Sequence, residues 1–149
     1  MNFVSAIAAV IAAFFSAAVY ILMTRKTTIV LTFNNGKDTI GYDMGEKPEL
    51  GFFLKNTGKV SAYNVEAVVY FPKGVSCQLG VNPEEAEYFD KPDRVVLRIN
   101  TLPPKSSPKQ IVTRWGVKFL SKPKKYEFRY EITGEKVKAS KGRLIVQTK

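Results

Sequence analysis

The chain begins with a long apolar segment that no charged residue interrupts. Residues 3–23 read FVSAIAAVIAAFFSAAVYILM. As a helix rising about 1.5 Å per residue, this segment is roughly 31 Å long, which matches the hydrocarbon core of a bilayer. Tyr20 lies near its far end, where an amphipathic ring suits the membrane interface, and residues 24–26 (TRK) end the run. The pattern predicts a transmembrane helix and its polar flank over residues 1–26.

From Thr27 onward the pattern changes to short runs in which apolar and polar residues alternate. In the clearest run, 126–132 (YEFRYEI), aromatic and aliphatic residues alternate with charged ones. Such a period of two is typical of strands, and turn residues separate the runs. The runs that we expect to form strands are 27–33, 50–55, 64–71, 75–81, 94–100, 110–120, 126–132 and 144–147. With no helical period after residue 23, this pattern predicts an all-β, antiparallel sandwich of seven to eight strands over residues 27–149.

Three interpretations of the N-terminal segment are open. A buried helix needs apolar partners on every side, whereas the rest of the chain has the pattern of strands. A cleaved signal peptide requires a basic region that residues 1–2 do not supply, although Ser16-Ala17-Ala18 is similar to a cleavage site. Because the apolar run continues to Met23, the sequence favours an uncleaved anchor in the cell membrane.

The charges that flank the segment predict its orientation. Arg25, Lys26 and Lys37 follow it, and no basic side chain precedes it. Because basic flanks stay in the cytoplasm, the N-terminus is expected outside and the β domain in the cytoplasm, with an extracytoplasmic domain as the alternative.

The same segment carries small residues four positions apart. These are Ser5, Ala9, Ala13 and Ala17. Such a stripe allows two helices to approach closely and form a homo-oligomer. The alternative is that alanine is simply abundant in this segment.

The composition argues against catalysis and against a metal site. The chain has no histidine and a single cysteine, Cys77, so it lacks the commonest general base and cannot form an internal disulfide or a cysteine metal cluster. The apolar surroundings of Cys77 favour a buried thiol over a reactive one. The acidic segment 82–93 lacks the spacing of a calcium loop and is interpreted as a solvated loop. We therefore expect no cofactor and no enzyme activity.

The net charge of +10 lies in the last third of the chain. Residues 103–149 hold thirteen of the 23 basic residues but only three acidic ones. The predicted contacts with an anionic surface are Lys122, Lys124, Lys125, Lys136, Lys138, Lys141 and Arg143. If folding brings them together, they form one basic face that contacts anionic lipid; the alternative is a solvated surface with lysines that protect sheet edges. Nucleic acid is disfavoured, because the aromatic residues of 126–132 alternate as a core face.

Several turns resemble those of a known family of domains. Residues 54–58 (LKNTG), 62–65 (AYNV) and 68–74 (VVYFPKG) resemble the signature of bacterial and archaeal immunoglobulin-like domains of the CARDB-like group. Residues 102–107 (LPPKSS) resemble the next turn of these domains, with Lys105 where they usually carry glycine. The resemblance covers residues 28–148. It implies an immunoglobulin-like β-sandwich used for adhesion or scaffolding, without catalytic residues, and the anchor with such a domain is similar to many small bacterial membrane proteins.

Together these features predict a single-pass, membrane-anchored, non-catalytic binding or scaffolding module with a protein partner. The alternative is a structural subunit of an oligomeric membrane complex that assembles through the transmembrane helix.

Overall fold

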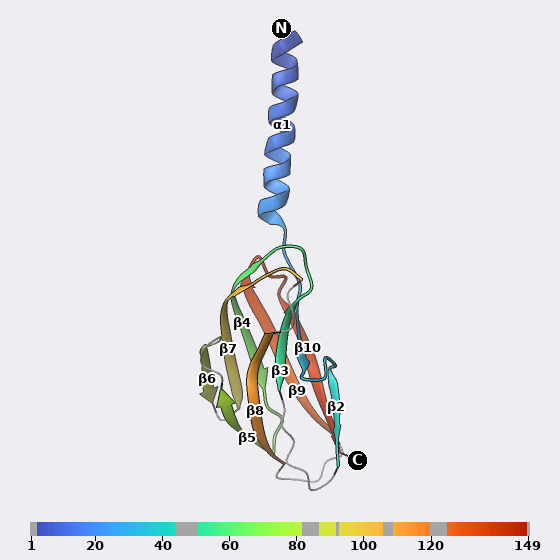
Figure 1. Ribbon diagram of the computed structural model, residues 1–149, viewed down its shortest axis with the longest axis vertical. Helices are drawn as coiled ribbons and strands as arrows, with labels where there is room; N and C mark the ends of the chain where they lie inside the picture. The colour runs from blue at the N-terminus through green and yellow to red at the C-terminus, as the bar shows by residue number, and fades with distance from the viewer. Residues whose placement is uncertain are drawn as a thin grey trace.

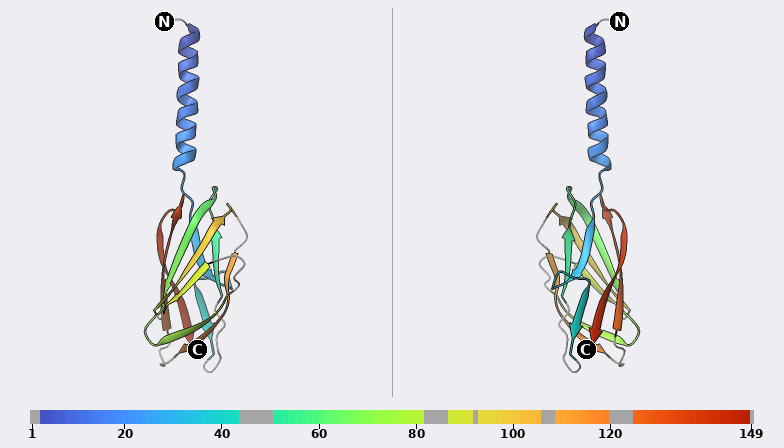
Figure 2. Two further views of the ribbon diagram at one scale, coloured as in Figure 1. Left: turned by 90° about the vertical axis from the view of Figure 1, so that its left-hand side faces the viewer. Right: turned by 90° about the vertical axis from the view of Figure 1, so that its right-hand side faces the viewer.

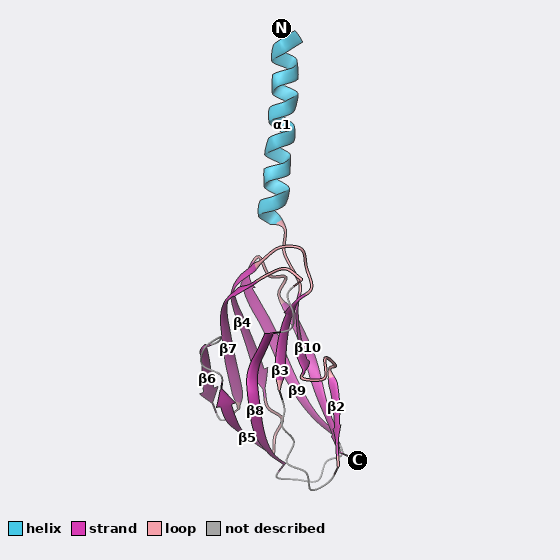
Figure 3. Cartoon of the chain, in the orientation of Figure 1, coloured by secondary structure: helices cyan, strands magenta, loops and turns pink. Residues whose placement is uncertain are grey.

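A computed structural model describes residues 3–43, 51–81, 87–91, 93–105, 109–119 and 125–148 of the chain. One helix, α1 (Phe3–Thr24), leads into a β-sandwich and points away from it along the long axis of the molecule (Figures 1 and 3). None of its residues is buried. Among the described residues, α1 is the one helix that is long and apolar enough to cross a membrane.

The sandwich consists of two sheets packed face to face (Figure 2). The strands are β1 (Ile29–Phe33), β2 (Thr39–Tyr42), β3 (Phe52–Asn56), β4 (Ala62–Tyr70), β5 (Val75–Val81), β6 (Glu87–Lys91), β7 (Arg94–Leu102), β8 (Lys109–Phe119), β9 (Lys125–Glu135) and β10 (Ser140–Thr148). One sheet has the order β1-β3-β8-β5, and the other has the order β2-β10-β9-β4-β7-β6. The chain ends at the end of the sandwich that lies away from α1 (Figure 1).

The β-sandwich behind one apolar helix confirms the predicted architecture, with two differences. The described residues form ten strands, because β2 and β6 add to the eight predicted runs. Both are strands of only four or five residues at the edges of the six-stranded sheet, which is too short a run for a period of two to be recognised. β6 also lies within the segment interpreted as an acidic loop. In addition, β2 pairs with β10 in parallel, so the sandwich is not wholly antiparallel.

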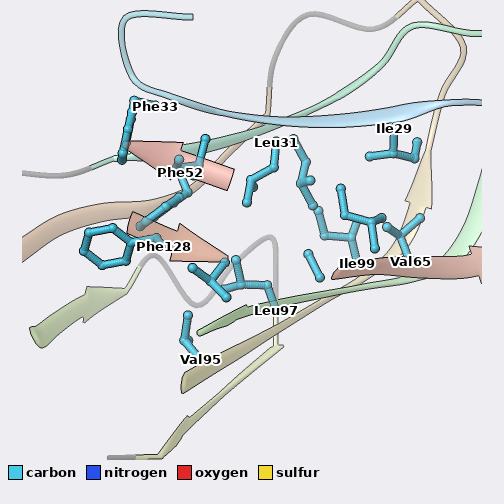
Figure 4. Packing of buried hydrophobic residues seen from close by; sticks show 14 of the residues in the cluster. Ile29, Leu31, Phe33, Phe52, Val65, Val95, Leu97, Ile99 and Phe128 are labelled. Carbon is cyan, nitrogen blue, oxygen red and sulfur yellow. The ribbon is translucent and has the colours of Figure 1, made fainter. Parts of the chain in front are cut away.

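The core lies between the two sheets and is built from the alternating apolar residues of each strand (Figure 4). Val95, Leu97 and Ile99 of β7 are buried, as the alternation in this strand predicts. From the opposite sheet, Phe33 and Phe52 pack with their rings 5.7 Å apart. Burying one such side chain contributes about 1.5–3 kcal/mol, so these inward faces are the main source of the stability of the fold.

A buried polar cluster fixes the chain where it enters the sandwich. The Thr27 hydroxyl donates to Asn56 Oδ1 at 2.5 Å, and Asn56 Nδ2 donates to the carbonyl oxygens of Val60 and Leu102 at 2.8 and 3.0 Å. The backbone N–H of Gly58 also donates to Asn56 Oδ1, at 3.0 Å. Asn56 thereby joins the segment after α1 to the β3–β4 loop and to the end of β7.

The turn after β3 depends on close packing and not on a left-handed backbone. Asn56 and Gly58 do not adopt a positive φ, which is found instead at Lys105 (48°) among other described residues. Gly58 is required for space, because a Cβ there would overlap the Thr27 hydroxyl. The positive φ of Lys105 is a backbone conformation that glycine adopts most readily.

Candidate functional site

The outer face of the six-stranded sheet carries a row of large polar and aromatic side chains. Tyr70 of β4 lies opposite Arg129 of β9, and Arg129 lies opposite Arg143 of β10. On the other side of β4, Tyr70 lies opposite Arg94 of β7. Because successive side chains of a strand point to opposite faces, these four residues form one outward-facing row. We call this row, with its neighbours Glu131 and Lys141, the binding face.

Two ion pairs flank the row. Lys141 Nζ lies 2.8 Å from Glu131 Oε1, and Arg143 Nε lies 3.4 Å from Glu127 Oε1. The hydrogen bond and the charge of Glu131 raise the pKa of Lys141 above its ordinary value. Since all four side chains are accessible to solvent, these pairs contribute little to folding stability. They instead fix the positions of the charges that a partner would meet.

A hollow of about 530 Å³ opens beside the row. It is lined by Tyr70, Arg129, Tyr130, Glu131, Lys141, Gly142 and Arg143. Gly142 lies opposite Tyr130 in the register of β9 and β10, and a Cβ at this position would overlap the Tyr130 ring and hydroxyl. The glycine therefore gives Tyr130 the space that it occupies in the wall of the hollow.

Tyr130 differs from the other inward residues of β9. Tyr126, Phe128 and Ile132 are buried as the alternation predicts, whereas Tyr130 is only partly buried. Burial and the nearby charge of Asp38 raise its pKa above the ordinary tyrosine value. The protonated hydroxyl is thus available as a hydrogen-bond donor.

Arg94 covers one end of the row. Its guanidinium lies 5.2 Å from the centre of the Tyr70 ring, which is a cation–π distance, and it donates to the neighbouring Asp93 carboxylate at 2.6 Å. Arg129 is exposed, and the structure gives it no ion pair within the described residues. An exposed guanidinium beside an aromatic ring suits a partner carboxylate, because its fork geometry allows two parallel hydrogen bonds.

The structure separates the basic residues that the sequence suggested as one face. Lys141 and Arg143 lie on the binding face, while Lys136 and Lys138 flank the β9–β10 turn beside Thr27. Lys125 pairs with Gln147 at the opposite end of β9. Lys122 and Lys124 lie outside the described residues. Folding therefore does not bring the described members of this set together.

Sequence reasoning missed Arg94, Tyr70 and Arg129. The alternation in 126–132 shows that Arg129 points away from the core, but its position beside Tyr70 depends on the pairing of β4 with β9. No local signal in the sequence reveals that register.

The small residues of the N-terminal helix have a different setting. Ser5, Ala9, Ala13 and Ala17 are all exposed along α1.

The described residues offer no site for a metal ion among histidine, cysteine, aspartate and glutamate side chains. Cys77 lies in β5, and its side chain is outside the described part of the chain. The side chains of the acidic segment 82–92 are likewise outside it. The described surface carries charged groups, aromatic rings and hydrogen-bond donors. Such groups can contact a binding partner.

Comparison with known proteins shows the fold. No protein-family model matches the sequence, and no curated protein matches it either. Among solved structures, the seventh ScaB type I cohesin of Pseudobacteroides cellulosolvens superposes with a TM-score of 0.53 at 9% identity, covering 84% of this chain and 93% of that one. A chain of a type I cohesin–dockerin complex from Clostridium thermocellum gives a TM-score of 0.52 at 13% identity, covering 82% and 99%. The sandwich is therefore cohesin-like in fold.

Proposed function

We propose that this protein is a single-pass, membrane-anchored, non-catalytic module whose β-sandwich, residues 27–149, binds a protein partner. The observation that carries the proposal is the exposure of α1. Large apolar side chains stay exposed along its whole length, for example Phe3 at 81%, Phe14 at 73% and Met23 at 72%. An exposed apolar surface of this length suits the hydrocarbon core of a bilayer. Residues 1–26 therefore act as the anchor and its flank.

The binding face supports recognition of a protein. It combines an exposed arginine, Arg129, with Tyr70 and with the cation–π pair of Tyr70 and Arg94. Arginine and tyrosine are the residue types that most often dominate the energy of protein interfaces. The similar Clostridium thermocellum structure is a complex of a type I cohesin with a dockerin, so a sandwich of this kind can take part in a protein complex. Arg129, which has no ion pair within the described residues, favours an acidic group of the partner.

The experiment places a photo-crosslinking amino acid in the full-length protein in its native membrane. One variant carries it at Tyr70 on the binding face, and a control variant carries it at Lys55, an exposed position of β3 in the other sheet. We expect a discrete crosslinked protein from position 70 only. Arg129→Glu in the same background should abolish that product, because it replaces the attracting charge with a repelling one.

Other outcomes would contradict the proposal. Equal products from both positions, or a position-70 product that survives Arg129→Glu, would show that the binding face does not recognise the partner. The anchor is tested separately by alkaline extraction of membranes and by the mass of the mature chain. Release into the soluble fraction, or loss of the N-terminal segment, would contradict an uncleaved span.

We also propose that the β domain lies on the cytoplasmic side of the membrane. Arg25 and Lys26 directly after α1 support a cytoplasmic β domain. A reporter cysteine after Lys149 in a Cys77→Ala background tests this. We expect a membrane-impermeant thiol reagent to label it only after lysis, and labelling in intact cells would place the domain outside the cytoplasm.

A second candidate function is a structural subunit that assembles through α1. The exposed stripe of Ser5, Ala9, Ala13 and Ala17 favours it, because small residues allow close helix contact. Ala13→Leu should then reduce crosslinked oligomers in the membrane, whereas Ala18→Leu, on another side of the helix, should not. Equal oligomer yields from both variants would remove this candidate.

A further inference from the structure

The end of the sandwich from which α1 leaves is joined to the helix by a very short connection. Only Arg25 and Lys26 separate α1 from Thr27, and the Arg25 N–H still donates to the Ile21 carbonyl oxygen at 3.1 Å. Thr27 pairs with both sides of the β9–β10 turn: its N–H donates to the Lys136 carbonyl oxygen at 2.7 Å, and the Lys138 N–H donates to its carbonyl oxygen at 2.8 Å. This end of the domain therefore has little freedom to move away from the helix.

Four separate segments bring basic side chains to this end. Figures 1 and 2 show the β3–β4 loop, the start of the β7–β8 connection and the β9–β10 turn next to the base of the helix. The Asn56 hydrogen bonds to Val60 and Leu102 join the first two to Thr27. The basic residues of these segments, all exposed, are Arg25, Lys26, Lys59, Lys105, Lys136 and Lys138. We call them the collar.

The charges of the collar are not neutralised by the described part of the protein. No ion pair joins any collar residue to a described carboxylate. Glu135 is the one acidic residue in the described segments of this end, and its Oε1 accepts a hydrogen bond from Asn64 at 2.7 Å. On the binding face, by contrast, Lys141 and Arg143 each have a carboxylate partner. Six cations that have no described carboxylate partner thus lie together at the helix end.

Two collar lysines have a left-handed backbone conformation, which other residue types adopt more readily. Lys105 has a φ of 48° and Lys136 a φ of 58°. Glycine and asparagine adopt this left-handed conformation most readily, whereas a longer side chain is uncommon there. The turns thus carry a positive charge at positions where the backbone alone would favour a glycine.

We infer that the collar binds the anionic headgroups of the membrane that α1 spans, and so holds the sandwich upright on the bilayer. This inference rests on the proposed anchor. The headgroup layer extends several ångströms beyond the hydrocarbon core, and the flexible lysine side chains next to the helix end reach into it. Basic residues at an anionic surface are attracted within about one Debye length, roughly 8 Å at physiological salt. Docking of the collar fixes the angle at which the binding face is presented to its partner.

The test uses the full-length protein in nanodiscs. A bimane fluorophore is attached to Ala139→Cys in a Cys77→Ala background, because position 139 is exposed within the β9–β10 turn. Lipids with a nitroxide on the headgroup quench the fluorophore when the collar docks. Discs of phosphatidylcholine alone are compared with discs in which about a third of the lipid is phosphatidylserine.

Two triple variants that remove the same number of positive charges distinguish binding by the collar from a general effect of net charge. The collar variant is Lys59→Gln, Lys105→Gln and Lys138→Gln. The control variant is Lys37→Gln, Lys73→Gln and Lys125→Gln, at exposed positions outside the collar. Arg25 and Lys26 are kept in both, so that the two charges directly after α1 are unchanged.

We expect phosphatidylserine to increase quenching in the parent and in the control variant, and high salt to reverse the increase. The collar variant should lose it, since removing three lysines lowers the ratio of docked to undocked domain by about 100-fold. Equal quenching in both kinds of disc for the parent, or an unchanged increase in the collar variant, would overturn the inference while leaving the anchor intact. Failure of the protein to co-purify with discs would instead overturn the anchor and the inference with it.

Discussion

The Thr27 hydroxyl donates a hydrogen bond of 2.5 Å to Asn56 Oδ1, and both side chains are buried. Thr27 is the third residue after α1, and Asn56 is the last residue of β3. Their contact therefore joins the proposed membrane anchor to the four-stranded sheet. Because Asn56 also bonds the ends of the β3–β4 loop and of β7, one amide joins three segments at the end of the sandwich nearest α1.

We expect Asn56→Ala to be strongly destabilising. The variant removes the partners of the Thr27 hydroxyl, the Gly58 N–H and the Leu102 carbonyl, which leaves buried polar groups without hydrogen bonds. The free energy of unfolding should fall by about 2–4 kcal/mol. Urea denaturation of the full-length protein in detergent, followed by circular dichroism, measures it.

The matched control is Asn100→Ala on β7. Asn100 is exposed, so the change should stay within about 0.5 kcal/mol. If Asn56→Ala were as mild as the control, the amide would not hold this end of the domain together.

Gly58 and Thr27 should be coupled energetically. Since a Cβ at position 58 would overlap the Thr27 hydroxyl, Gly58→Ala alone should cost about 1–3 kcal/mol. Thr27→Ala removes that hydroxyl, so the double variant should be more stable than the sum of the two single effects predicts. A double-mutant cycle from thermal unfolding measures the coupling. Strict additivity would show that the turn moves to accommodate the methyl group.

The sequence predicted the parts of the fold that depend on local alternation. β7 and β9 were identified because apolar residues recur every second position over a long run, which is the direct consequence of burying one face. The edge strands β2 and β6 were missed, because runs of four and five residues are too short to show a clear period of two. The buried thiol predicted for Cys77 and the anionic contact predicted for Lys122 stay predictions, because these side chains lie outside the described part of the chain.

The sites depend on pairings that the sequence does not show. Tyr70 meets Arg129, and Lys59 comes to the same end as Lys136, only because strands distant in the chain lie side by side. The excess of basic residues after position 102 was visible in the sequence. In the structure, these basic residues are divided between the two ends of β9, with Lys125 at one end and Lys136 just beyond the other. A count of charges along the sequence does not show at which end of the sandwich each one lies.

Neighbouring valines of β7 provide a test of the inward and outward faces. Val95 is fully buried between the sheets, whereas Val96 is half-buried on the other face. Val95→Ala should lower the free energy of unfolding by about 1.5–3 kcal/mol, through lost burial and the cavity that it leaves. Val96→Ala makes the same chemical change and should cost under about 1 kcal/mol. Equal losses in urea titrations would mean that both faces of β7 are covered.

Tyr130 should make stability depend on pH in the alkaline range. Burial, and then the charge of Asp38, raises its pKa in the folded protein, so the folded state holds the phenolic proton more tightly than the unfolded state does. Its contribution is therefore fully present below the ordinary tyrosine pKa of about 10, and it is lost as the pH rises through the folded value. We expect Tyr130→Phe to flatten the fall in unfolding free energy above about pH 10. Asp38→Asn should shift the onset of ionisation of Tyr130 to lower pH, as followed by NMR of labelled tyrosine. A slope that is the same in the parent and in Tyr130→Phe would show that the folded environment does not favour the protonated phenol.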